Sequence, residues 1–278
     1  MRTNRGERGD DSNRDVKPLE RKRACDMADP KRLEMLRQTL AQLDGKASGA
    51  PRRLLPTGTA AIDQALGGGL ALGVLHDLAP VRAADLAAAT GFALALAARR
   101  QNFVLWIQQE IAAYEAGTLY GPGLDLFGLP MDRLLVLRVA RLRDALWAME
   151  EALLSGSVAS VIVEVPKDGA DLTATRRLSI AGEGSGTLAL LLHHRSSSAP
   201  SAAATRWQIA AHPGPRDEFG GLGRTSFALS LVKNRHGPTG QWHVTWDHHE
   251  HAFTTAPSRR VAAAAFDRPD HALLARVG

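Results

Sequence analysis

The most constraining feature of the sequence is the stretch from Leu55 to Arg100. Its pattern predicts a capped helix over residues 57–66, a glycine turn, a buried strand over residues 74–78, a loop and an alanine-rich helix. A buried strand followed by a loop and a helix is typical of the first βα unit of a nucleotide-binding α/β domain, where the loop normally holds phosphates. The stretch therefore predicts an α/β domain and directs attention to that loop.

The loop reads LAPVRAADL and lacks the residues that phosphate binding needs. Phosphate binding requires glycines, so that backbone N–H groups can converge on the phosphate, together with a lysine and a hydroxyl group for Mg²⁺. Placed from Pro80, the motif puts its last glycine on Ala84 and its lysine on Asp85. Its hydroxyl residue falls on Leu86, and Arg82 is the positive charge that remains. We therefore expect a strand–helix turn that binds no nucleotide cofactor and supports no ordinary ATPase activity.

The remainder of this domain alternates apolar strands with helices and then changes character. The apolar strands are predicted over residues 103–107, 134–139, 158–165 and 187–192, and the helices between them over residues 141–154 and 172–184. Continuous apolar strands separated by helices indicate a parallel sheet that is covered on both faces. Three further runs, which alternate apolar and polar residues without intervening helices, cover residues 206–210, 226–232 and 241–246. These predict antiparallel strands that extend one edge of the sheet.

Composition limits the class of protein. The chain has 278 residues and 45% hydrophobic content, which suits one core domain with tails. Its longest apolar runs fall short of the roughly 20 residues of a membrane span, so we expect no membrane contact and a cytoplasmic location. The single cysteine, Cys25, excludes an internal disulfide and a cysteine metal cluster. The net charge of +5 is compatible with nucleic acid or an acidic partner, and equally with a high-GC coding bias.

The domain organisation follows from these patterns. The predicted parts are a disordered charged extension over residues 1–28, an N-terminal helix and linker over 29–53, a core domain over 54–250 and a flexible C-terminal tail over 251–278. The extension is nearly free of large apolar side chains, so it cannot support a core. Met27 begins a more ordinary sequence, and we expect it to be the natural start, with residues 1–26 an extension upstream of the native protein.

Several segments resemble the RecA recombinase core in the same order. TGTAAIDQALGGGLALGVLHDLAP resembles the entry to that core, FVLWIQQE its second strand and catalytic carboxylate segment, and VASVIVEV its Walker B strand. SFALSLVKNRHGPTG is similar to the segment in which a late strand ends in a Lys-Asn turn. Within this superfamily, the degenerate loop and the segment TATRRLSIAGEGSGTLALLL most resemble the ImuA family. These are RecA-like proteins, encoded beside error-prone polymerase genes and described as related to SulA division inhibitors.

The resemblance implies a fold and a function. The implied fold is an α/β RecA-like core, with a mostly parallel sheet flanked by helices and antiparallel edge strands near the C-terminus. The implied function is a non-catalytic, nucleoid-associated accessory role in SOS-induced translesion synthesis. In that role the protein would link an ImuB-type Y-family-like subunit, RecA or DNA to an error-prone DNA polymerase. The alternatives are an ATP-dependent recombinase-like enzyme with a divergent phosphate loop and a SulA-like inhibitor of cell division.

The resemblance also assigns positions to candidate site residues. Glu164 falls where the Walker B acid lies, and the glutamate that activates water aligns with Gln109 or, after a one-residue shift, with Glu110. Without the loop lysine, Glu164 is expected to be a polar residue at a strand end rather than a metal ligand.

Two polar clusters near the C-terminus invite other interpretations. A basic turn is predicted at Lys233, Asn234, Arg235 and His236. It can contact a phosphate backbone or an acidic partner, or it can be a solvated turn. Nearby histidines are His243, His248, His249 and His251. They suit a polar strand exit better than a metal site, so we expect no metal.

Overall fold

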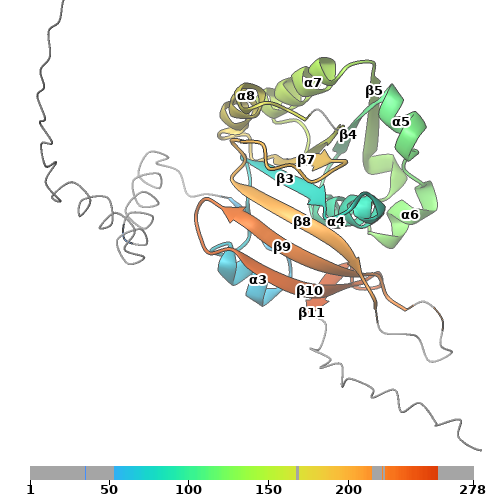
Figure 1. Ribbon diagram of the computed structural model, residues 1–278. Helices are drawn as coiled ribbons and strands as arrows, with labels where there is room; N and C mark the ends of the chain where they lie inside the picture. The colour runs from blue at the N-terminus through green and yellow to red at the C-terminus, as the bar shows by residue number, and fades with distance from the viewer. Residues whose placement is uncertain (1–34, 36–52, 167–168, 215–220, 222, 256–278) are drawn as a thin grey trace, which may run out of the picture. The chain divides into compact units, whose positions relative to one another are not determined.

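The computed structural model describes residue 35 and residues 53–166, 169–214, 221 and 223–255 (Figure 1). The chain divides into two compact units, Met1–Pro51 and Arg52–Gly278, and the elements below belong to the second. The predicted extension over residues 1–28, and the predicted helix and linker over 29–53, lie outside the described residues apart from positions 35 and 53. None of the helices in the described part of the chain has the length and hydropathy that a membrane span requires.

The described residues form one large sheet and one small one. The small sheet pairs β1 (Leu54–Leu55) with β2 (Leu70–Ala71). The large sheet contains β3 (Leu75–Pro80), β4 (Val104–Gln109), β5 (Leu134–Val139), β6 (Ser160–Val165), β7 (Leu188–His193), β8 (Thr205–His212), β9 (Ser226–Asn234), β10 (Gly240–Asp247) and β11 (Ala252–Thr255). The helices are α3 (Ala60–Ala65), α4 (Leu86–Ala98), α5 (Glu110–Ala116), α6 (Gly121–Leu126), α7 (Leu142–Ser155) and α8 (Leu172–Gly182), with 3-10 turns η2 (Ala83–Asp85) and η3 (Met131–Arg133). The predicted α/β class is confirmed, and most elements lie within two residues of their predicted ranges.

The strand order of the large sheet within the described residues is β11-β10-β9-β8-β3-β7-β6-β4-β5. Every pair from β8 to β5 is parallel, and every pair from β8 to β11 is antiparallel. We predicted β8 as an antiparallel strand, which is correct for its pairing with β9 but wrong for its pairing with β3. The prediction missed the parallel pairing because β7 reaches β8 through a crossover loop that contains no helix. β8 is therefore the strand at which the sheet changes direction.

A buried ion pair holds β8 beside β3 in this parallel arrangement. The Arg206 guanidinium donates two hydrogen bonds to Asp77 Oδ2, at 3.2 and 3.1 Å, and His193 Nε2 lies 3.3 Å from Asp77 Oδ1. Burial by itself raises the pKa of Asp77, but the interactions with His193, Ser201 and Arg206 together outweigh it and leave the pKa below its usual value. Arg206 also donates to the carbonyl oxygens of Ser197 and Ala199. The same side chain therefore anchors both the strand and the crossover loop.

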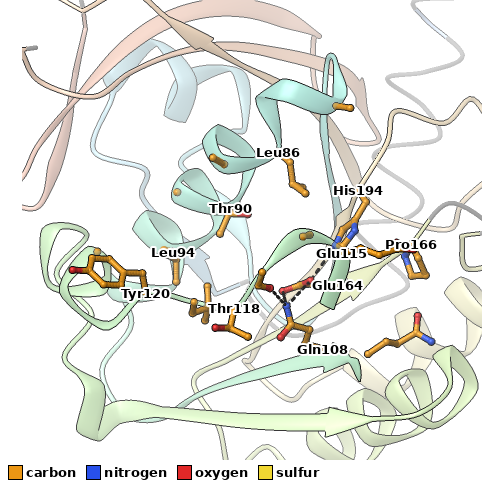
Figure 2. Close-up of a pocket in the computed structure, with 18 of the residues that line it drawn as sticks. Leu86, Thr90, Leu94, Gln108, Glu115, Thr118, Tyr120, Glu164, Pro166 and His194 are labelled. Atoms are coloured by element: carbon orange, nitrogen blue, oxygen red, sulfur yellow. Dashed lines mark hydrogen bonds and ion pairs between the residues drawn. The ribbon is translucent and has the colours of Figure 1, made fainter. Parts of the chain in front are cut away.

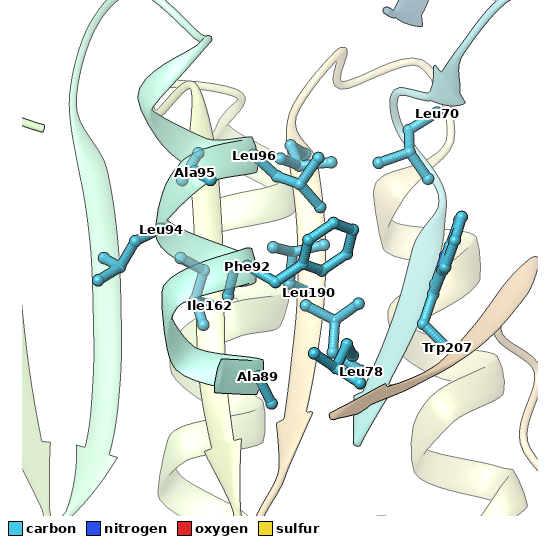
Figure 3. Close-up of a cluster of buried hydrophobic side chains, with 14 of the residues drawn as sticks. Leu70, Leu78, Ala89, Phe92, Leu94, Ala95, Leu96, Ile162, Leu190 and Trp207 are labelled. Carbon is cyan, nitrogen blue, oxygen red and sulfur yellow. The ribbon is translucent and has the colours of Figure 1, made fainter. Parts of the chain in front are cut away.

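Two apolar layers cover the parallel part of the sheet. On one face α4 packs against β3, β7 and β8, and Phe92 and Leu96 lie among Leu78, Leu190 and Trp207 (Figure 3). The helix is rich in alanine and is buried over most of its surface. The opposite face is covered by α7 and α8. Because β6 and β7 are covered on both faces, their sequences are mostly apolar, whereas the equally buried β3 also carries His76 and Asp77.

The sheet continues past residue 250, where we expected a flexible tail to begin. Residues 252–255 form β11, which pairs antiparallel with β10. Phe253 is buried, and its ring lies 5.5 Å from the ring of Phe92 and 4.8 Å from that of Trp246. The short strand therefore extends the apolar layer beneath α4 on the side of the antiparallel strands. The rest of the predicted tail lies outside the described residues.

One buried histidine on β3 is fully hydrogen-bonded. His76 Nε2 donates to the carbonyl oxygen of Ala71 at 2.9 Å, and its Nδ1 accepts from the Thr205 hydroxyl at 2.8 Å. The Trp207 indole N–H donates to the same hydroxyl oxygen at 2.9 Å. Burial lowers the pKa of His76 from 6.5 to about 4, so the ring is neutral near pH 7. The network links β2, β3 and β8.

We expect the free energy of unfolding to fall as the pH drops from 6.5 to about 4. In this interval the unfolded chain binds a proton at His76 that the folded chain excludes, which costs up to about 3 kcal/mol of stability. Urea denaturation at successive pH values should show a shallower dependence for His76→Gln than for the wild type. His249→Gln, at an exposed histidine, serves as the control. Parallel curves for the wild type and His76→Gln would contradict the assignment.

Candidate functional site: a degenerate phosphate loop and the cleft beside it

The loop between β3 and α4 folds around the side-chain carboxylate of one of its own residues, Asp85. Asp85 is 2% exposed, and its Oδ2 accepts hydrogen bonds from the Arg82 backbone N–H and from Arg82 Nε, both at 3.1 Å. Its Oδ1 accepts from the backbone N–H of Ala211 on β8 at 3.1 Å. In a phosphate loop, backbone N–H groups of this kind hold an anion. Here the anion is a side chain of the chain itself.

The charges of the loop are balanced internally. The hydrogen bond from Arg82 lowers the pKa of Asp85 and outweighs the opposing effect of burial, so the carboxylate is ionised at neutral pH. In the alignment from Pro80, Asp85 stands at the position of the phosphate-loop lysine. A negative charge therefore replaces the positive charge that would attract phosphate. Pro80 ends β3, the exposed Ala84 stands where a glycine would be, and Leu86 starts α4 without a hydroxyl. These features favour a structural turn over a phosphate site.

Glu164, which the sequence resemblance aligns with the Walker B acid, also accepts hydrogen bonds from the chain itself. This β6 residue is 5% exposed, and its Oε1 accepts from the Trp106 indole N–H at 2.7 Å and from the Gln108 amide at 3.0 Å. Its Oε2 accepts from His194 Nε2 at 2.9 Å and from the same amide at 3.1 Å (Figure 2). A magnesium ligand needs free carboxylate lone pairs. The observed contacts instead fit a buried hydrogen-bonded cluster.

Sequence reasoning did not identify the partners of Glu164. The resemblance directed attention to Gln109 and Glu110, whereas Gln108 makes the contact. Glu110 is exposed at the start of α5, and the buried Oε1 of Gln109 has no hydrogen-bond partner among the described residues. Alternation along a strand puts Trp106 and Gln108 on one face, so periodicity offered a signal. Periodicity does not give the strand order, however, and it is the order β7-β6-β4 that brings this face of β4 close to Glu164 and His194.

The Glu164 cluster lines one end of a cleft of about 1070 Å³. The cleft lies along α4 and under the segment that follows β4, and its labelled lining residues include Thr90, Leu94, Thr118 and Tyr120 (Figure 2). Most of the wall is apolar, and the lining residues Gln108, Glu164 and His194 lie at the carboxyl ends of β4, β6 and β7. Ligands of open α/β sheets bind at this edge. Within the described residues, no group of three histidine, cysteine or acidic side chains is placed to hold a metal ion.

The predicted basic turn after β9 is tied to the chain rather than free. Lys233, Asn234 and Arg235 donate side-chain hydrogen bonds to backbone carbonyl oxygens, and the backbone N–H of His236 donates to the Asn234 side chain. The carbonyl acceptors belong to Ser201, Ala65 and Ala202, at 2.8, 3.0 and 3.3 Å respectively. Burial, followed by the charges of neighbouring arginines, lowers the pKa of Lys233. Of these four residues only Arg235 is exposed, which favours a structural turn.

Replacing Asp85 tests its role as the internal anion of the loop. Asp85→Ala leaves the backbone N–H groups of Arg82 and Ala211 without their acceptor, so we expect the free energy of unfolding to fall by about 1–3 kcal/mol. Chemical denaturation measures the loss. The matched control is Asp144→Ala, which removes exposed ion pairs with Arg141 at 3.7 Å and Arg143 at 3.6 Å and should cost less than about 1 kcal/mol. Equal losses in the two variants would contradict the structural role of Asp85.

Comparison with known proteins places the chain in a family. No protein-family model matches it. Protein ImuA of Caulobacter vibrioides, in strain NA1000 / CB15N and in strain ATCC 19089 / CIP 103742 / CB 15, is 32% identical over 210 residues, which span 69% of this chain and 83% of that protein. Among solved structures, the RadB recombinase aligns with a TM-score of 0.53 and 15% identity, covering 73% of this chain and 100% of that one. That likeness shows a RecA-like recombinase fold, and the sequence relationship shows that this chain belongs to the ImuA family.

Proposed function

We propose that this protein is a non-catalytic RecA-like accessory protein of damage-induced, error-prone translesion synthesis. Two findings support the proposal, namely membership of the ImuA family and the RecA-like fold. In this role the protein acts as a scaffold, and it uses surfaces of a recombinase core without turning over nucleotide. It works in the cytoplasm, in association with the nucleoid.

The observation that carries the non-catalytic part of the proposal is the position of the Asp85 carboxylate. It accepts hydrogen bonds from backbone N–H groups of the loop and of β8, and it is ionised there. A bound triphosphate would have to displace this carboxylate and then lie beside its negative charge. The carboxylate of Glu164 supports the same interpretation, because both of its oxygens already accept hydrogen bonds from side chains of this chain.

The proposed partners are an ImuB-type Y-family-like subunit and an error-prone DNA polymerase, together with RecA or DNA. The basic turn of Lys233 to His236 contributes little to DNA binding in this scheme, because most of its polar groups bind the chain itself. Arg235 is the side chain of the turn that is exposed enough to reach a phosphate. Any DNA contact is therefore expected to depend on surfaces other than this turn.

We expect the purified protein to bind no ATP in the micromolar range. Equilibrium dialysis against labelled ATP and Mg²⁺ measures this directly, with a P-loop ATPase of known affinity as the positive control. Arg82→Ala should leave the result unchanged, because Arg82 is already paired with Asp85 at 3.1 Å. Saturable micromolar binding would contradict the pseudo-site and favour the recombinase-like alternative.

A genetic test addresses the accessory role. Deleting the gene should abolish ultraviolet-induced mutation, and complementation with the wild type should restore it. Complementation with Arg82→Ala should restore it equally, because the proposed role does not use phosphate binding at the loop. An unchanged frequency of ultraviolet-induced mutation in the deletion strain would contradict the proposal. Filamentous growth on overexpression would then favour the SulA-like alternative.

A further inference from the structure

The last strand of the parallel side, β5, is an exposed apolar edge. It pairs with β4 alone, and among the described residues no strand lies on its outer side (Figure 1). Leu135, Val136 and Leu137 are 46%, 50% and 37% exposed. A strand that is paired on one side leaves half of its backbone N–H and C=O groups without a strand partner. The outer side of β5 therefore offers both apolar surface and hydrogen-bonding groups.

This edge lacks the devices that usually protect a sheet edge. Natural edge strands are kept very short, interrupted by proline or bulges, or loaded with charges. The β4–β5 register has no shift, and β5 reads LLVLRV, with six residues and one charge. By contrast, β11 at the other edge of the sheet is four residues long. The apolar surface also continues onto the neighbouring strand, because Phe103, just before β4, is 44% exposed on the same face as Leu135.

The sequence around β5 is complementary to itself. If two copies pair antiparallel about Leu135, Leu134 of each copy lies opposite Val136 of the other. In this arrangement Arg138 of one copy approaches the 3-10 turn before β5 of the other copy, which carries Asp132, and the two-fold symmetry repeats this contact. Both charged side chains are exposed, and neither has an ion-pair partner among the described residues. Apolar residues therefore meet apolar ones, and acid meets base.

We propose that the outer edge of β5 pairs with the β5 edge of a second copy of this chain. The pairing is antiparallel and isologous, and it joins the large sheets of the two copies into one continuous sheet across a two-fold axis. Backbone hydrogen bonds provide the attraction, and burial of Leu135, Val136 and Leu137 adds to it. The Arg138–Asp132 contacts select the register. This inference does not depend on the proposed role in translesion synthesis.

The first test measures the mass of the full chain in solution. Sedimentation equilibrium at tens of micromolar should give a dimer for the wild type. Leu135→Lys places two lysines opposite each other on the two-fold axis and should raise the dissociation constant about tenfold or more. Val232→Lys is the matched control, because Val232 is a strand residue with 43% exposure, and this variant should remain dimeric. A monomeric wild type, or a Leu135→Lys dimer as tight as the wild type, would overturn the proposal.

A charge exchange tests the register and remains informative if Leu135→Lys fails to fold. Arg138→Asp leaves two acidic groups at each contact, and Asp132→Arg leaves two basic groups. Each variant alone should therefore dissociate, whereas an equimolar mixture of the two should form heterodimers, because every contact then joins acid to base. The double variant Asp132→Arg/Arg138→Asp should dimerise like the wild type. If both single variants dimerise as tightly as the wild type, the β5 pairing is wrong.

Discussion

The fold depends on the burial of β3 on both faces. This strand lies at the centre of the sheet between β7 and β8, and α4 and α8 pack against opposite sides of it. Any polar group on such a strand must find a partner inside the protein, because an unpaired buried group costs several kcal/mol. His76 and Asp77 are the two cases, and each has one of its partners on β8, namely Thr205 and Arg206 respectively. The hydrogen bonds that satisfy the buried polar side chains of β3 therefore also fix the position of β8, the strand at which the sheet changes direction.

The same principle applies to the loop between β3 and α4 and to the carboxyl end of β6, where buried carboxylates are paired within the chain. Asp85 provides the loop with an anion, and Glu164 is enclosed by donors from β4 and from the residue after β7. The sequence resemblance assigns both carboxylates to positions that interact with nucleotide and magnesium in a RecA core. In this chain each is satisfied by its own fold, while a cleft remains beside them. The region keeps the architecture of a ligand site and uses its polar groups for stability.

Much of the fold was predictable because each signal was local. The nearly continuous apolar run of β6 predicted a strand that is covered on both faces. The glycine turn over residues 67–69 and the alanine-rich helical pattern that follows predicted the positions of β3 and α4. Two features were not predictable in this way. The parallel pairing of β8 depends on a crossover without a helix, and β11 was hidden in an alanine- and arginine-rich segment whose short strand is held by Phe253. Both depend on contacts between residues far apart in the chain.

The sequence by itself determined the α/β class, the family resemblance and the absence of loop glycines and of the loop lysine, because these are properties of residue type and spacing. Only the tertiary structure decided what the polar residues do. It showed that Gln108, rather than Gln109, meets Glu164, and that the basic turn at Lys233 binds the carbonyl oxygens of its own chain. It also left β5 at an open edge. The physical reason is that partners and exposure are set by strand order, which brings together residues that no local pattern relates.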